Sequence, residues 1–103
     1  MTISGPTPEE PTYQKEFQAS VELFEKSFQG VQSSTFDQQR AQYVQVMQES
    51  LKTMQESASG MVNERLIALK NTLSTDVNQY LDSPTSEHQQ KVQADLDQIK
   101  SEE

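Results

Sequence analysis

Apolar residues recur along the middle of the chain with the period of one long α-helix. Steps of three or four residues, with no change of phase, connect Val44, Met47, Leu51, Met54, Ala58, Val62, Leu66, Leu69, Leu73, Val77 and Tyr80. The mean step matches the α-helical repeat of about 3.6 residues per turn. Because a cap is available at Ser34 or Thr35 and no proline follows until Pro84, the pattern predicts a helix over about 35–82.

A turn at Gly60 is the alternative. The segment Ser57-Ala58-Ser59-Gly60 could end a helix, since a glycine inside a helix costs about 1 kcal/mol relative to alanine. A turn would normally shift the phase of the apolar positions, yet the phase continues past Gly60. We therefore favour a continuous central helix of about 70 Å. A bend at Gly60 would instead give a four-helix up-down bundle.

Shorter helices are predicted on both sides of the central one. The first covers about 12–31, and one of its faces carries Phe17, Val21, Phe24, Phe28 and Val31. Ser83 and Pro84 mark the start of the last helix, over about 84–100, whose thin apolar face consists of Val92, Leu96 and Ile99. Short loops make each flanking helix antiparallel to the central one. The predicted fold class is all-α with three helices, and neither a strand pattern nor an internal repeat of 20–50 residues is evident.

The domain organisation follows from proline placement and chain length. Residues 1–11 contain three of the four prolines and no apolar period, so we expect a disordered tail there. Residues 12–100 form a single helical domain, as 103 residues allow, and residues 101–103 form a frayed C-terminus. Apolar residues make up only 32% of the chain, so self-association is one way to complete a thin core.

The second half of the central helix is where a partner is expected to dock. Only three apolar residues of the last helix can cover it, and each fully buried Leu or Val contributes about 1.5–3 kcal/mol. Methionines spaced by seven residues also suit surfaces that accept varied helices. The predicted partner-binding residues are therefore Met54, Met61, Leu66, Leu69 and Leu73. The expected partner is another protein or a second copy of the chain, which makes a homo-oligomer the favoured assembly.

Charge and composition narrow the classes of partner and compartment. The net charge is −8 and no basic stripe exists, which argues against nucleic acid and anionic membranes. The absence of cysteine excludes disulfides and thiolate metal sites. No apolar run is long enough to span a membrane, and the N-terminus lacks the order of a signal peptide. We expect a cytoplasmic protein, with secretion by a specialised route as the alternative.

Residues capable of catalysis are scattered. His88 is the only histidine, so no catalytic triad or histidine metal cluster can be built from it. Asp95 and Asp97 lack the glycine and terminal glutamate of a calcium-binding loop. The three glycines form no phosphate-binding loop. We therefore expect no catalytic, cofactor or metal site, and predict that the protein is not an enzyme.

The leading hypothesis is a non-enzymatic interaction module, such as an adaptor, co-chaperone or assembly subunit, that docks through its apolar stripe. The heptad spacing over residues 44–61 would also suit a coiled-coil stalk. Phe28-Gln29-Gly30 near the first turn, in an acidic chain of this length without cysteine, resembles the WXG100 family of secreted helical hairpins. The resemblance covers three residues, lacks the family's tryptophan and leaves a third helix unexplained. It implies a small secreted helical protein; a bacterial secretion chaperone is similar in size and charge.

Overall fold

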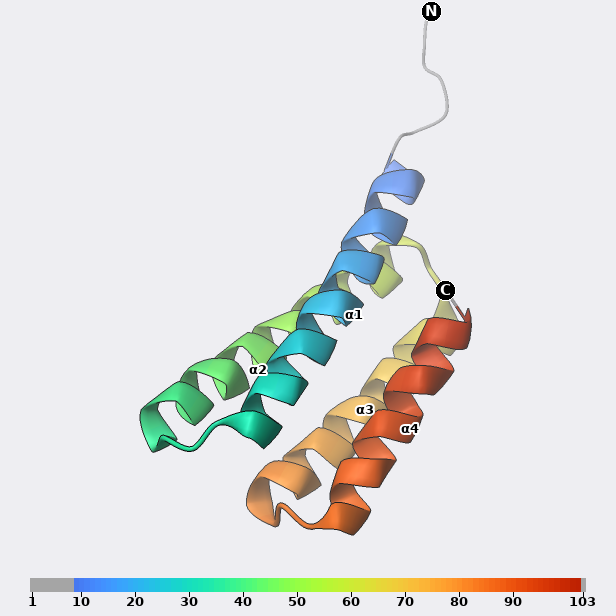
Figure 1. Cartoon of the computed structure of the whole chain (residues 1–103). Helices are drawn as coiled ribbons and strands as arrows, with labels where there is room; N and C mark the ends of the chain where they lie inside the picture. Colours follow the sequence, from blue (N-terminus) through green and yellow to red (C-terminus); the bar gives the residue numbers. More distant parts are fainter. Residues whose placement is uncertain (1–8, 103) are drawn as a thin grey trace, which may run out of the picture.

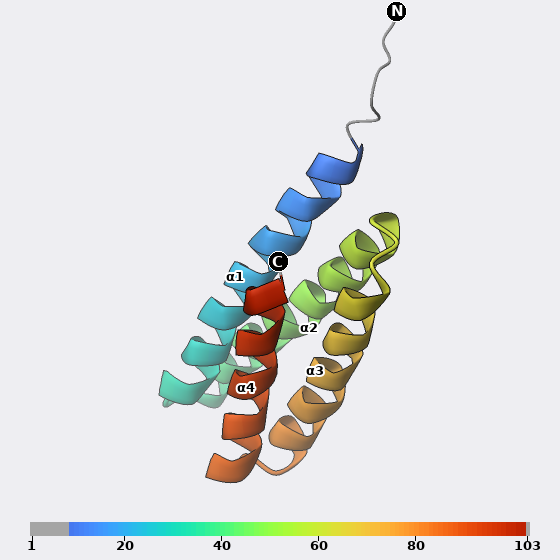
Figure 2. The same cartoon turned by 90° about the vertical axis from the view of Figure 1, so that its right-hand side faces the viewer.

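The computed structural model describes the backbone of residues 9–102 and the side chains of residues 12–102. It contains four helices: α1 (Glu9–Ser33), α2 (Asp37–Gly60), α3 (Glu64–Asp82) and α4 (Ser86–Glu102). Consecutive helices run antiparallel, which gives an up-down arrangement of an α1–α2 hairpin and an α3–α4 hairpin (Figures 1 and 2). The predicted continuous helix over 35–82 is therefore wrong, and the alternative with a bend at Gly60 is confirmed.

The ends of the chain differ in part from the predicted boundaries. Most of the predicted tail over residues 1–11 lies outside the described residues, and α1 already begins at Glu9. The last helix extends to Glu102, so the predicted fraying of residues 101–103 can be compared only up to that residue. Among the described helices, none is both long and apolar enough to cross a membrane.

A three-residue turn, Met61 to Asn63, reverses the chain between α2 and α3. The Val62 amide donates to the Ser59 carbonyl and the Asn63 amide donates to the Ala58 carbonyl, both at 3.0 Å. This pair of bonds is the Schellman arrangement that ends many helices. The Asn63 side chain then accepts from the Leu66 amide at 3.1 Å and caps α3. Free backbone groups at two helix ends are thus satisfied within one short segment.

Val62 occupies the left-handed position of this turn. Its φ of 53° is the only positive φ of a non-glycine residue in the described part of the chain. Left-handed backbone costs an L-residue roughly 1–2 kcal/mol, and a β-branched side chain is among the least suited to it. Glycine usually occupies this position, but Gly60 lies two residues earlier, inside α2. The glycine signal in the sequence is therefore displaced from the residue that turns the chain.

The phase of the apolar pattern survives the turn because both helices face one core. Both α2 and α3 turn their apolar positions toward this core. The steps of three or four residues between buried positions therefore continue from α2 into α3 although the chain reverses. An unbroken phase is therefore compatible with either a straight helix or a reversal. Counting apolar steps alone did not separate the two.

Two glycine–tyrosine contacts close the α1–α2 hairpin at its opposite ends. A Cβ atom on Gly30 would lie 2.6 Å from the Tyr43 ring, and one on Gly60 would lie 2.6 Å from the Tyr13 ring. Between these contacts the two helices bury the small side chains of Ser20, Ser27, Ser50 and Ser57. Small residues allow helix backbones to approach closely, and α1 and α2 have the most extensive close backbone contact of any helix pair.

These contacts reveal a repeat of thirty residues between α1 and α2. Residues of α1 that recur thirty positions later with the same identity are Tyr13, Gln18, Ser20, Ser27 and Gly30, matching Tyr43, Gln48, Ser50, Ser57 and Gly60. Buried apolar positions recur with altered identity: Phe17, Val21 and Phe24 correspond to Met47, Leu51 and Met54. This correspondence keeps packing positions and changes most apolar side chains, so sequence identity alone makes no repeat evident.

Aromatic residues join the two hairpins at the centre of the molecule. The Phe24 and Phe28 rings of α1 lie 6.1 Å apart, and the Tyr80 ring of α3 meets Phe28 edge-on at 5.5 Å. The α4 face predicted from sequence, including Leu96 and Ile99, is fully buried against this core. Nearer the surface, Lys100 Nζ lies 3.1 Å from Glu25 Oε2, and Gln89 Nε2 donates to Gln32 Oε1 at 2.7 Å; both contacts link α4 to α1.

Candidate functional site

The five predicted partner-binding residues lie in or against the core of the single chain. Met54, Leu66 and Leu73 are buried, while Met61 and Leu69 are partly buried against the same cluster. Met61 and Leu66 share a small cleft of about 90 Å³ that Phe17 also lines. The expectation that this row stays uncovered in one chain is wrong, because the reversal after Gly60 folds it inward. Its role in partner binding stays a prediction.

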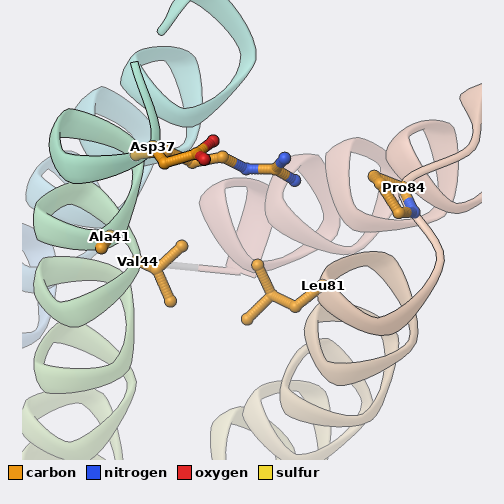
Figure 3. Close-up of a pocket in the computed structure, with 6 residues that line it drawn as sticks. Asp37, Ala41, Val44, Leu81 and Pro84 are labelled. Carbon is orange, nitrogen blue, oxygen red and sulfur yellow. The ribbon is translucent and has the colours of Figure 1, made fainter. Parts of the chain in front are cut away.

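A wide groove lies between α2 and α3, at the end remote from their connecting turn. The two helices diverge from that turn (Figure 1), and the groove left between them measures about 520 Å³. Figure 3 shows Val44 of α2 and Leu81 of α3 pointing toward each other across it. The groove is lined by Asp37, Arg40, Ala41, Val44, Leu81 and Pro84.

This α2–α3 groove combines an apolar floor with a charged rim. Ala41 is exposed, whereas Val44 and Leu81 are half-buried against the core. Asp37 and Arg40 belong to the first turns of α2, where a carboxylate is favoured by the helix dipole. Phe36, which immediately precedes Asp37, is 68% exposed. Apolar surface with a few charged groups beside it is typical of protein-binding sites, where aromatic residues and arginine are enriched.

The groove has no local signature in the sequence because its two walls are far apart in the chain. Val44 belongs to the apolar series and Leu81 directly follows its last member, Tyr80, so the sequence predicts both on one straight helix. The reversal at residues 61–63 instead brings them opposite each other. The exposed Phe36 was the one available signal, since it is a large apolar residue at a predicted helix start.

A second, smaller groove lies on the solvent-facing side of the α1–α2 hairpin. Its volume is about 290 Å³, and Leu23, 48% exposed, contributes its largest apolar side chain. Four residues of α1 and three of α2 line it. Six of them correspond across thirty positions, Ala19, Ser20 and Leu23 with Glu49, Ser50 and Thr53, and Glu16 of α1 completes the lining. The groove therefore lies where the two halves of the repeat meet, and its charged rim is acidic.

Two carboxylates meet between α3 and α4. The Oδ2 atom of Asp95 is buried without a hydrogen-bond donor, and the nearby carboxylate of Asp76 can pair with it only if one of the two carries a proton. Burial, followed by the hydrogen bond and charge of Asp76, raises the pKa of Asp95 to about 7. From the sequence, Asp95 and Asp97 form no calcium-binding site, and the fold instead places Asp95 beside Asp76 of another helix.

Asp95 is the only acid with a strongly raised pKa among the described residues, and it lines neither groove. No group of three or more His, Cys, Asp or Glu side chains in residues 12–102 is arranged to hold a metal ion. The arrangement allows the two carboxyl groups to share a proton across the helix interface. Its direct consequence is a pH-dependent contribution to the packing of α3 against α4.

His88 serves the start of α4. Its Nδ1 lies 2.7 Å from the Ser83 carbonyl, so the ring donates from Nδ1, and its backbone amide donates to Thr85 Oγ1 at 3.2 Å. Thr85 therefore caps a helix that begins at Ser86, which corrects the predicted cap at Ser83 and start at residue 84. No chemistry beyond helix capping is indicated for the histidine.

Comparison of the chain with protein-family models, with curated proteins and with solved structures gives no match.

Proposed function

We propose that the protein is a non-enzymatic helical interaction module that binds another protein through the α2–α3 groove. The observation that carries the proposal is the pairing of an apolar floor, formed by Val44 and Leu81, with Arg40 at its edge. A helix or loop of the partner would place an apolar side chain between these two residues. Roles such as adaptor, co-chaperone or assembly subunit share this mechanism.

Arg40 gives the proposed site its orientation. The ion pairs formed by the described residues involve Arg65, Lys91 and Lys100, so Arg40 forms none within this part of the chain. A guanidinium group offers five donors in a planar fork that fits a carboxylate. The preferred partner therefore has an Asp or Glu beside its apolar anchor. In a chain of net charge −8, the remaining surface would repel strongly acidic partners and restrict binding to this local match.

The test compares two exposed alanines on different helices. Ala41→Arg fills the groove with a charged side chain, whereas Ala94→Arg makes the same change on the exposed side of α4. Proteins captured by the wild type would be identified, purified and titrated against each variant. We expect Ala41→Arg to weaken binding by at least about tenfold and Ala94→Arg to leave it within about twofold. Equal affinities for the two variants would exclude the groove as the binding site.

A secreted helical protein or secretion accessory is the second candidate. The observation that favours it is the long antiparallel α1–α2 hairpin, in which the Phe28-Gln29-Gly30 segment precedes the turn. Gly30 nevertheless lies inside α1, against Tyr43, and the α3–α4 hairpin adds two helices to the simple hairpin. Detecting the tagged chain outside cells that express it natively would support export. Full retention in the cytoplasmic fraction would leave the interaction module as the better proposal.

A further inference from the structure

Val62 is out of place in the apolar series that runs through α2 and α3. Of the eleven residues in that series, eight are buried, and Val44 and Leu69 are partly buried. Val62 alone is 80% exposed. In a continuous helix it would lie between Ala58 and Leu66, on the same face as the other ten residues. The chain therefore carries an apolar residue that suits an uninterrupted helix but stands in solvent when the chain reverses.

The backbone conformation of Val62 also favours an uninterrupted helix. The reversal holds this β-branched residue at a φ of 53°, in the left-handed region, whereas valine is readily accommodated in a right-handed helix. Straightening residues 61–63 would relieve that conformation and bury the side chain. The cost would be loss of the contacts between the two hairpins, unless another chain supplies them.

Each hairpin keeps its own internal contacts if the turn opens. The α1–α2 pair retains its serine-lined interface and both glycine–tyrosine contacts. The α3–α4 pair retains the Arg65–Glu102 ion pair, whose Nε–Oε1 distance is 2.8 Å, at its end nearest the turn. What opening breaks is the seam between hairpins, including the Lys100–Glu25 and Gln89–Gln32 contacts. That seam can be rebuilt unchanged by the α3–α4 hairpin of a second copy.

We propose that two copies of this chain exchange their α3–α4 hairpins by straightening residues 61–63 into one helix running from Asp37 to Asp82. Each half of the dimer would then reproduce the four-helix packing of the single chain. The two long helices would run antiparallel and cross near residues 61–63, where Met61 and Val62 of one copy would meet the same residues of the other. A short, strained hinge between two self-contained units is the situation that favours domain swapping.

The first measurement is the mass in solution after refolding. Wild-type protein refolded at high concentration should contain a dimer, separable by size exclusion with light scattering, whereas dilute refolding should give monomer. Val62→Gly relaxes the closed turn and disfavours the helix, so we expect its dimer association constant to fall at least about tenfold. Val62→Ile, also β-branched, should behave like wild type. Asn63→Ala removes the cap that defines the turn and should increase the dimer fraction.

The second measurement distinguishes exchange from simple side-by-side association. The chain has no cysteine, so one variant carries Glu25→Cys and another carries Lys100→Cys, and the two are refolded together. Because these positions touch across the seam, a short bismaleimide should join two different chains only when α4 of one lies on α1 of the other.

Three results would overturn the exchange: a monomeric mass at every concentration, a dimer that yields no cross-link between chains, or unchanged dimerisation of Val62→Gly. The exchange is independent of the proposed function. Ala41→Arg leaves the hinge untouched and should not change the dimer fraction, so either idea can fail alone.

Discussion

Gly30 and Gly60 show why the meaning of a residue depends on what it touches. Within helices, both would ordinarily be weak points. Each instead admits a tyrosine ring from the neighbouring helix at a distance that no side chain could tolerate. What matters at both positions is that glycine has no side chain, and not that its backbone is conformationally free.

Replacing Gly30 tests this role. Gly30→Ala gains up to about 1 kcal/mol of helix propensity. Displacing the Tyr43 ring should cost more, about 1–3 kcal/mol, because the nearest ring atoms would lie 2.6 Å from the new Cβ. We expect net destabilisation in urea unfolding. The double variant with Tyr43→Ala should recover the helix-propensity gain relative to Tyr43→Ala alone, and a stabilised single variant would contradict the packing.

The Asp95 carboxyl makes a second prediction at the scale of single residues. Its folded pKa of about 7 lies above its ordinary value of 3.8, so the native state binds a proton more readily than the unfolded chain. The stability that this group contributes is fully present below about pH 4 and is lost as pH rises toward 7. Because the side chain is only partly buried, solvent screening leaves an effect on the order of 1 kcal/mol.

Asp95→Asn should therefore raise the free energy of unfolding at pH 8 and flatten the decline between pH 4 and 7. The asparagine can donate to the Asp76 carboxylate without needing a bound proton. Urea titrations at pH 5 and pH 8 measure the difference. Asp97→Asn, on the exposed face of the same helix, is the control and should leave the pH profile unchanged. The raised pKa of Asp95 would be refuted if the wild-type free energy of unfolding rose from pH 4 to pH 7 and Asp95→Asn showed the same pH profile.

At the scale of elements, the caps at the helix ends determine where the chain reverses between one helix and the next. Two of the three connections are set by short segments whose polar side chains capture free amides: Asn63 for α3 and Thr85 for α4. From the sequence, a break at Gly60 is only the alternative to a continuous helix, and the last helix is expected to start at Ser83 and Pro84. Several Ser, Thr and Asn residues in a row can each cap a helix, and only the backbone path selects among them.

The cap of α4 separates the two assignments experimentally. Thr85→Ala removes the acceptor for the His88 amide and should cost about 1 kcal/mol. Ser83→Ala should cost a few tenths at most, since the interaction recorded for Ser83 with His88 uses its backbone carbonyl. Thermal unfolding of both variants measures the difference. The reverse order of costs would restore the cap predicted from sequence.

The core of the whole molecule includes the few apolar residues of α4, and they are completely buried. Leu96 is completely buried, whereas Leu23 of α1 is 48% exposed. Leu96→Ala should therefore cost about 2–5 kcal/mol, and Leu23→Ala less than about 1 kcal/mol. Urea unfolding measures both values. Similar costs would show that α4 is not the cover that completes the bundle.

The candidate site could be predicted only in part at this scale. Apolar periodicity places Met54, Leu66 and Leu73 on one face, and the structure buries that face within the single chain, whereas the sequence alone suggested a docking surface. The α2–α3 groove requires residues about forty positions apart to face each other, and no local pattern encodes that distance. The proximity of Asp76 and Asp95 could not be predicted from the sequence for the same reason, because the two residues belong to different helices.

The sequence by itself determined that the chain is all-helical and roughly where the first helix ends and the last one begins, because propensity, periodicity and capping act over a few residues. Only the tertiary structure decided whether the apolar series runs straight or doubles back at residues 61–63. Both paths keep its phase, and they differ mainly in long-range burial. That choice places Val44 opposite Leu81, buries the expected docking row and leaves Val62 exposed in a strained turn.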